Sequence, residues 1–493
     1  MPDSQQIVIG ADLEGRPIGQ AMRLANRHGL VAGATGTGKT VTLQRLAEVF
    51  SDAGVAVFAA DIKGDLCGLG AAGDPQGKVA ERIAGMPWLN HSAKAYPVTL
   101  WDVHGQSGHP LRTTLSEMGP LLLGSLLELT DSQQSALYAA FKVADREGLL
   151  LLDLKDLKAL LGYLKDNPQA LGEDSALMTT GSSQALLRRL AVLEQQGAEA
   201  LFGEPALQLE DILQPASDGR GRIHLLDASR LVHEAPKVYA TFLLWLLAEL
   251  FEQLPERGDA DKPLLALFFD EAHLLFADTP KALQDRLEQV VRLIRSKGVG
   301  VYFVTQSPGD LPDNILAQLG LRIQHGLRAF TSKEQKSLRA VAEGFRPNPQ
   351  FDALTVLTEL GIGEALVGTL QEKGTPEMVQ RVLVAPPQSR IGPLTEGERA
   401  ALISRSPLAG HYDKPIDRES AYEMLLARQG AATQASKAEE KSDGGLADIA
   451  GGFLGGLAGQ AVKSAMRQAA TQIGRELVRG LMGSLLGGSK KRR

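Results

Sequence analysis

The stretch Gly33-Ala34-Thr35-Gly36-Thr37-Gly38-Lys39-Thr40 satisfies every fixed position of the phosphate-loop pattern G-x-x-x-x-G-K-[ST]. The apolar residues 29–32 come before it and predict a short buried strand, and residues 41–50 follow with apolar side chains at helical spacing. A strand, a glycine-rich loop and a helix in this order distinguish a phosphate loop from a glycine-rich turn before an ordinary helix. The stretch therefore predicts a nucleoside triphosphate site at residues 33–40.

Each residue type in this loop has a chemical reason to be there. Glycines let successive backbone N–H groups approach phosphate oxygens where a Cβ would clash, and the helix N-terminus adds partial positive charge. We expect Lys39 to bridge the β- and γ-phosphates and the Thr40 hydroxyl to bind Mg²⁺. The predicted cofactors are ATP and Mg²⁺.

A second pattern predicts the reaction. Residues 264–269 form a continuous apolar run, typical of a buried strand, and Asp270 and Glu271 follow it directly. We expect Asp270 to orient Mg²⁺ and Glu271 to polarise the attacking water, the alternative being the solvated end of a strand. A water-activating carboxylate favours hydrolysis over transfer to another acceptor. The 231 positions from Lys39 to Asp270 favour a motor ATPase with an insertion over a compact kinase.

Two further polar residues follow predicted strands. Gln306 ends the apolar run 301–305, where it can hydrogen-bond the γ-phosphate or the attacking water, or be a simple strand-end residue. His273, in Asp270-Glu271-Ala272-His273, matches the box of one helicase class, but the rest of that class's pattern is missing. We expect His273 to pack or hydrogen-bond rather than catalyse.

Predicted strands and helices alternate along the chain, which indicates an α/β fold with a mostly parallel sheet. A leucine-rich region interrupts the alternation, and Thr130 with Gln133 in it forms a capping-box pattern. The first part of the core is predicted at residues 1–110 and the second part at 216–395, with a helical insertion at 111–215 between them. A helical extension follows at 396–428, and a linker with a flexible tail at 429–493. Strands are predicted at 55–60, 222–227, 264–269, 300–305, 321–327, 365–370 and 381–384, and helices at 236–254 and 281–297.

Composition indicates a cytoplasmic globular protein. The chain has 493 residues, of which 44% are hydrophobic, and this length suits two or three domains. Its single cysteine, Cys67, excludes an internal disulfide and suits a reducing compartment. No signal peptide is predicted, because the first residues lack a basic segment followed by an apolar core.

Charge is unevenly distributed. The chain carries −6 in total, but residues 457–493 hold eight basic residues and one acid, which leaves −13 for the remainder. Nucleic acid contact is therefore expected only from a local patch or an assembled pore. Glycines at 451, 455 and 459 and an apolar stripe over 462–481 leave two readings of this tail: a marginal helix, or a basic amphipathic helix that docks on a membrane surface or a partner.

Four segments in this order resemble one superfamily. GATGTGKT at 33–40, DIKGD at 61–65, FFDEAH at 268–273 and FVTQSP at 303–308 are similar to the HerA/FtsK ATPases, most closely the bacterial HerA-like proteins of the YjgR type. The resemblance implies a RecA-like core and a homohexamer with ATP sites between subunits. It also implies that a neighbour's arginine completes each site. Arg328 is our preferred candidate, with Arg322 and Arg295 as alternatives.

These patterns lead to one function and two alternatives. The leading prediction is a Mg²⁺-dependent ATPase that works as a ring motor, with Lys39, Glu271, Gln306 and Arg328 in the reaction and double-stranded DNA as the substrate. The first alternative is an ATPase that acts on protein or at a membrane, which the acidic body and basic tail motivate. The second is a scaffold that binds ATP and turns it over slowly.

Overall fold

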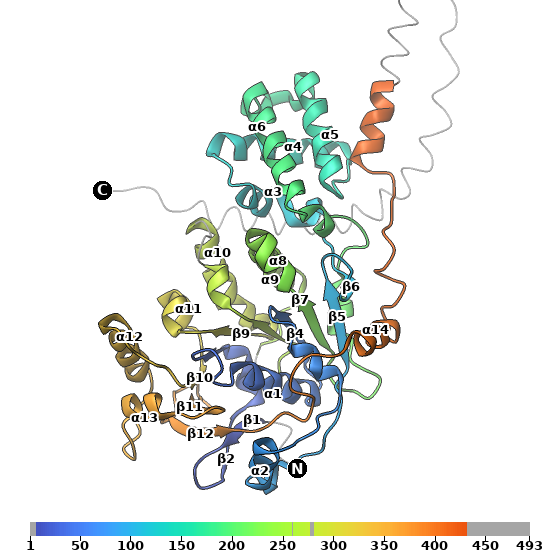
Figure 1. Ribbon diagram of the computed structural model, residues 1–493. Helices are drawn as coiled ribbons and strands as arrows, with labels where there is room; N and C mark the ends of the chain where they lie inside the picture. Colours follow the sequence, from blue (N-terminus) through green and yellow to red (C-terminus); the bar gives the residue numbers. More distant parts are fainter. Residues whose placement is uncertain (1–5, 259, 277–280, 431–493) are drawn as a thin grey trace, which may run out of the picture. The chain divides into compact units, whose positions relative to one another are not determined.

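The computed structural model describes residues 6–258, 260–276 and 281–430. A twelve-stranded sheet runs through them in the order β2-β1-β12-β11-β10-β3-β9-β8-β4-β7-β5-β6 (Figure 1). The strands from β10 to β6 in this order pair in parallel, and β11, β12, β1 and β2 continue the sheet antiparallel. The bounds are β1 Gln6–Ala11, β2 Pro17–Ala21, β3 Gly29–Ala32, β4 Ala56–Asp61, β5 Val98–Asp102, β6 His109–Pro110, β7 Ile223–Asp227, β8 Leu265–Phe269, β9 Val299–Thr305, β10 Leu321–His325, β11 Glu364–Gly368 and β12 Gln380–Val384.

Helices cover both faces of this sheet, which gives the α/β fold that the alternating pattern predicts. Their bounds are α1 Lys39–Asp52, α2 Lys78–Ala84, α3 Leu115–Leu126, α4 Asp131–Glu147, α5 Leu154–Asp166, α6 Thr180–Gln195, α7 Leu209–Leu213, α8 Ser229–Glu234, α9 Pro236–Gln253, α10 Lys281–Ile294, α11 Asp313–Leu316, α12 Ser332–Glu343, α13 Ala353–Glu359 and α14 Glu396–Ser404.

The strand β4 shows how the sequence builds the two layers. Successive side chains of a strand point to opposite faces. Phe58 and Ala60 accordingly join the apolar core that contains α9 and α10, while Val57 and Ala59 join the core that contains α1. Every residue of β4 is buried, as expected for a central strand of a parallel sheet.

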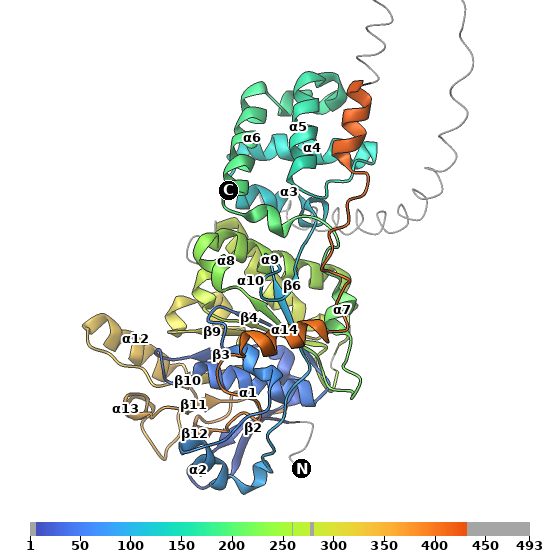
Figure 2. The same ribbon diagram turned by 45° about the vertical axis from the view of Figure 1, so that its right-hand side comes forward.

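The region between β6 and β7 is helical. Helices α3 to α6 gather into one group in both views, and α3 contacts α9 (Figures 1 and 2). The capping box at the start of α4 forms as predicted, with the Thr130 backbone N–H donating to Oε1 of Gln133 at 3.1 Å. The apolar side chains of this group belong to the same continuous core as α9, α10 and one face of the sheet. The insertion therefore shares a continuous apolar core with the sheet, with α3 packed against α9.

Some elements differ from the sequence predictions. The hairpin β1–β2 and the strands β5 and β6 were not predicted from the sequence. The predicted strand 321–327 ends at His325, and the predicted helix 281–297 ends at Ile294 in a short 3₁₀ turn. The predicted linker and basic tail from residue 431 onward lie outside the described residues. Within the described part of the chain, none of the helices has the length and apolar character that crossing a membrane requires.

Candidate nucleotide-binding site

The loop between β3 and α1 has the backbone that a phosphate cradle requires. Gly36 and Gly38 have φ of 78° and 112°, in the region that favours glycine. A Cβ at Gly33 would lie 2.5 Å from Cβ of His325, and one at Gly38 would lie 3.2 Å from the backbone of Gly363. The glycines are therefore needed both for the turn of the loop and for its close packing.

Lys39 is the first residue of α1, and its side chain is buried against the loop. Its Nζ donates to the carbonyl oxygens of Gly33 at 2.5 Å and Ala34 at 3.2 Å. Burial lowers the pKa of Lys39, and the nearby charge of Lys63 lowers it further. The Lys39 ammonium is thus held beside the glycine loop, where the phosphates of a nucleotide would offer it stronger acceptors.

The two predicted carboxylates lie at the carboxyl end of β8, and their charges act on Lys39. Asp270 is buried, and burial raises its pKa to about 6, with Lys63 opposing the rise. Glu271 adopts a left-handed backbone with φ of 46°, and its N–H donates to Oδ1 of Asp270 at 3.0 Å. The structure therefore brings Lys39, Asp270 and Glu271 to one edge of the sheet.

The loop that follows β4 contributes to the same edge. The carboxylate of Asp61 accepts the N–H groups of Gly64 at 2.7 Å and Leu66 at 3.0 Å, which closes the loop into a tight turn. Burial raises the pKa of Asp61 to about 7, and the charge of Asp65 adds to the rise. This turn carries Lys63, whose Nζ lies 3.4 Å from Oε1 of Glu271. The sequence supplied DIKGD only as part of a resemblance, and a role for Lys63 was missed.

Gln306 directly follows β9, which lies between β3 and β8 in the sheet. Its side chain is exposed and lines a cavity of about 330 Å³ together with His273, Phe276 and Asp310. Asp310 accepts the Thr305 hydroxyl at 2.7 Å, which orders the turn after β9. Gln306 is therefore placed at the edge that the sequence predicts, and its role stays a prediction.

His325, the last residue of β10, connects this strand to α1. The sequence did not predict this contact. Its Nδ1–H donates to the Glu364 carbonyl oxygen at 2.9 Å, and its Nε2 accepts the Thr42 hydroxyl at 2.9 Å. Burial lowers the pKa of His325 to about 4, so the imidazole is neutral near pH 7. Sequence offered no signal for it, because a lone histidine at a strand end has no distinctive spacing.

The residues present fit a magnesium ion of the kind that accompanies nucleotides. The described residues contain no group of three or more His, Cys, Asp or Glu side chains that could hold a metal by themselves. Mg²⁺ at phosphate sites typically takes one or two protein ligands and completes its shell with phosphates and water. Thr40, which is half-buried, and Asp270 would supply those two ligands.

The three arginine candidates lie at opposite ends of the parallel strands. Arg328 is exposed and follows the carboxyl end of β10, on the same edge as the glycine loop. Arg322 and Arg295 instead line a pocket of about 420 Å³ beside the amino ends of β10 and β9. Arg322 is held there by the carbonyl oxygens of Leu319, Gly344 and Leu316.

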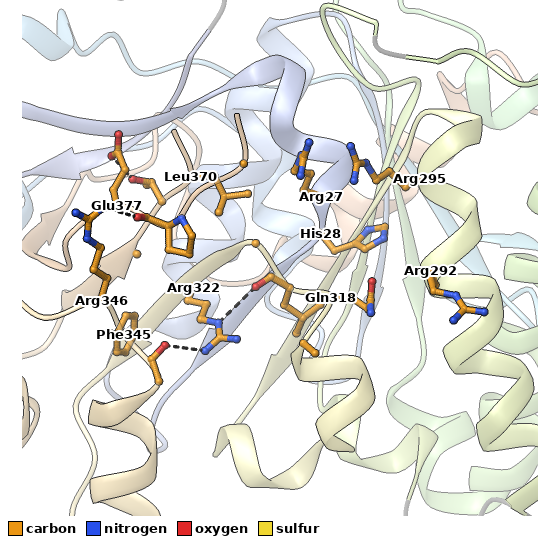
Figure 3. A pocket seen from close by; sticks show the side chains of 18 residues that line it. Arg27, His28, Arg292, Arg295, Gln318, Arg322, Phe345, Arg346, Leu370 and Glu377 are labelled. Carbon is orange, nitrogen blue, oxygen red and sulfur yellow. Dashed lines mark hydrogen bonds between the residues drawn. The ribbon is translucent and has the colours of Figure 1, made fainter. Parts of the chain in front are cut away.

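Other arginines gather around this second pocket (Figure 3). Arg27 precedes β3, Arg292 belongs to α10 and Arg346 follows α12, and all three line the pocket with Arg295 and Arg322. Glu377 is the one carboxylate in the pocket lining that the structure describes. Sequence reasoning could not assemble this set, because its members come from segments that are far apart along the chain. The pocket is suited to an anion.

Comparisons with known proteins agree with this geometry. The family model for the helicase HerA-like C-terminal region matches residues 6–492. A truncated form of the bacterial conjugative coupling protein TrwB superposes with a TM-score of 0.53 at 15% identity, covering 79% of this chain and 91% of TrwB. TrwB in complex with ADP and Mg²⁺ gives 0.52 at 16% identity, covering 78% and 90%.

VirB4 of Thermoanaerobacter pseudethanolicus is also similar, with a TM-score of 0.49 at 17% identity, covering 81% of this chain and 99% of VirB4. The comparison with curated proteins gave no match. The family model spans nearly the whole chain, and the sheet carries the phosphate loop and the paired carboxylates at one edge. The chain belongs to the HerA-like family and has the α/β fold of its P-loop ATPases.

Proposed function

We propose that this protein hydrolyses ATP with the help of Mg²⁺. The observation that carries the proposal is the convergence of Lys39, Asp270 and Glu271 at the carboxyl edge of the parallel sheet, beside the glycine loop. Lys39 and the loop N–H groups bind the phosphates, and Thr40 and Asp270 would hold a magnesium ion, which would supply positive charge against the charge that develops on the phosphates. Glu271 accepts a proton from the attacking water, while Gln306 orients that water or the γ-phosphate.

We further propose that the chain assembles head to tail into a homohexamer. A heterologous interface uses two different faces of each subunit. The glycine loop and the arginine-lined pocket lie at opposite ends of the parallel strands, so they belong to two different faces. In this arrangement Arg295 of the pocket faces the neighbour's nucleotide. Arg328, the candidate favoured by sequence, lies at the loop's own edge and is the second assignment.

Mixing variants distinguishes the two arginines. Arg295→Ala and Arg328→Ala are each mixed with Glu271→Gln, which is inactive alone. The alanine variant of the arginine that acts across the interface should be inactive alone and should regain turnover in the mixture. Turnover returns because some interfaces of the mixed ring then pair an intact Glu271 with an intact arginine. A monomeric protein with full ATPase activity would exclude both assignments.

Double-stranded DNA is the substrate that we propose for the motor, acting in the cytoplasm. Support comes from the helicase description of the family and from the similarity to a conjugative coupling protein. A protein-directed or membrane-associated ATPase is the alternative, motivated by the acidic body of the chain.

The deciding experiment is the ATPase rate with and without double-stranded DNA, on protein whose oligomeric state has been measured by light scattering. We expect stimulation that weakens as salt rises, since phosphate contacts release counterions. ATPase activity that DNA does not alter at any salt concentration would favour the alternative. A protein that binds ATP but turns it over only slowly, with or without DNA, would be a nucleotide-gated scaffold.

A further inference from the structure

The carboxylate of Glu271 lies between the ammonium of Lys63 and the imidazole of His273. Oε1 is 3.4 Å from Nζ of Lys63, and Oε2 is 3.5 Å from Nδ1 of His273. Only 12% of the Glu271 side chain is exposed, against 42% for Lys63 and 36% for His273. Oε2 is buried and has no hydrogen-bond partner in the described part of the chain. Among the described residues, the charged partner of the carboxylate is therefore Lys63, and Oε2 accepts no hydrogen bond.

The fold fixes where Lys63 can reach. The strands β4 and β8 are neighbours in the sheet, with Ala60 opposite Phe269, so the loops that follow them emerge side by side. Asp61 ties the first loop down through the N–H groups of Gly64 and Leu66, which leaves Lys63 on a closed turn beside Glu271. Both partners of the ion pair thus lie within two residues of the carboxyl ends of neighbouring strands.

This arrangement opposes the role that Glu271 has in hydrolysis. A general base needs a carboxylate oxygen within hydrogen-bond reach of the water that attacks the phosphate. The ion pair instead directs Oε1 of Glu271 toward the Lys63 ammonium at 3.4 Å. The left-handed backbone at Glu271 is a local strain of the kind found at switch regions.

We propose that Lys63 is a positioning residue that restrains Glu271 in a resting orientation, with His273 as the second contact, and that hydrolysis requires this clamp to open. The inference rests on the proposed ATPase function. Turnover is then proportional to the fraction of ATP-bound protein in which Glu271 has left Lys63. The charged groups around Lys63 also include Asp65, Asp270 and Lys39, so removing the Lys63 ammonium changes the electrostatic environment of these three groups as well as that of Glu271.

The test is the steady-state ATPase of Lys63→Met in the full chain without DNA. Because a partly exposed ion pair contributes up to about 1 kcal/mol, we expect kcat to rise about two- to fivefold while KM stays within about a factor of two. Lys63→Arg keeps the charge and should bring kcat back toward the wild-type value. His273→Ala should also raise kcat. Lys165→Met, on the exposed face of α5, is the matched control and should leave both constants unchanged.

The outcomes separate this inference from the function on which it rests. If the wild type does not hydrolyse ATP, or Glu271→Gln is as fast as the wild type, the proposed function fails. If the wild type hydrolyses ATP, Glu271→Gln is slow and Lys63→Met is no faster than the wild type, only the clamp is wrong. A fall in kcat for Lys63→Met would overturn the clamp and make Lys63 a direct participant in the reaction.

Discussion

Glu48 on α1 offers the sharpest test of how the loop helix is held in place. Its side chain is fully buried and accepts the N–H groups of Gln388 at 2.9 Å and Ser389 at 2.8 Å, with the Ser389 hydroxyl at 2.6 Å. Arg45 lies 3.7 Å away. This carboxylate therefore binds the segment after β12 to the helix that begins at Lys39.

The expected cost of Glu48→Ala follows from these contacts. Each buried N–H left without an acceptor costs about 1–3 kcal/mol. Burial raises the pKa of Glu48, because desolvating the charged carboxylate costs free energy. Removing the carboxylate recovers that cost and offsets part of the destabilisation. We expect a net destabilisation of about 2–4 kcal/mol. Glu48→Gln keeps one oxygen for the donors and should cost about 1 kcal/mol.

Thermal unfolding of the nucleotide-free protein measures the difference. For a unit of this size, unfolding entropy makes 1 kcal/mol equivalent to about 1 °C. Glu48→Ala should then lower Tm by about 2–4 °C, Glu48→Gln by about 1 °C, and Glu173→Ala at an exposed position by less. Equal shifts for the two Glu48 variants, or none for Glu48→Ala, would refute the reasoning from hydrogen bonds.

Further predictions address the site, the pH dependence and the tail. Lys39→Ala should weaken ATP binding by about 10- to 100-fold, whereas Glu271→Gln should keep affinity and lower kcat by at least about 10²-fold; equal losses of affinity in a nucleotide titration would contradict these roles. Burial, and next the charge of Arg222, lower the pKa of His224 to about 3, so the folded chain stays neutral there while the unfolded chain takes up a proton near pH 6.5. Stability is therefore lost below pH 6.5, and His224→Gln should reduce the loss between pH 7 and 5 by about 2 kcal/mol in urea denaturation. Deleting residues 446–493 should leave Tm and ATPase activity unchanged and abolish any binding to anionic vesicles in a flotation assay.

Local signals were enough to predict the nucleotide loop. The pattern at residues 33–40 lies between a strand and a helix that are its immediate neighbours in sequence, so short-range spacing carried the prediction. The paired carboxylates after β8 were predictable for the same reason. By contrast, β1 pairs with β12 more than 300 residues away, and no short window of sequence contains that pairing.

Contacts that depend on which strands are neighbours in the sheet could not be predicted from the sequence. The contact between Lys63 and Glu271 exists because β4 and β8 are neighbours in the sheet, although about 200 residues separate them in sequence. The arginine pocket depends in the same way on β3, β9 and β10 lying side by side. Strand order, rather than any motif, determines these parts of the site.

The shared apolar core of the helical insertion and the sheet has a mechanical consequence. Close-packed interiors deform little, so we expect helices that share a core with the sheet to move together with it. If the sheet rotates during the proposed ATP cycle, the displacement would then be larger at the far end of α3 to α6 than at the sheet. A partner bound to those helices would be displaced by an amount that increases with its distance from the nucleotide.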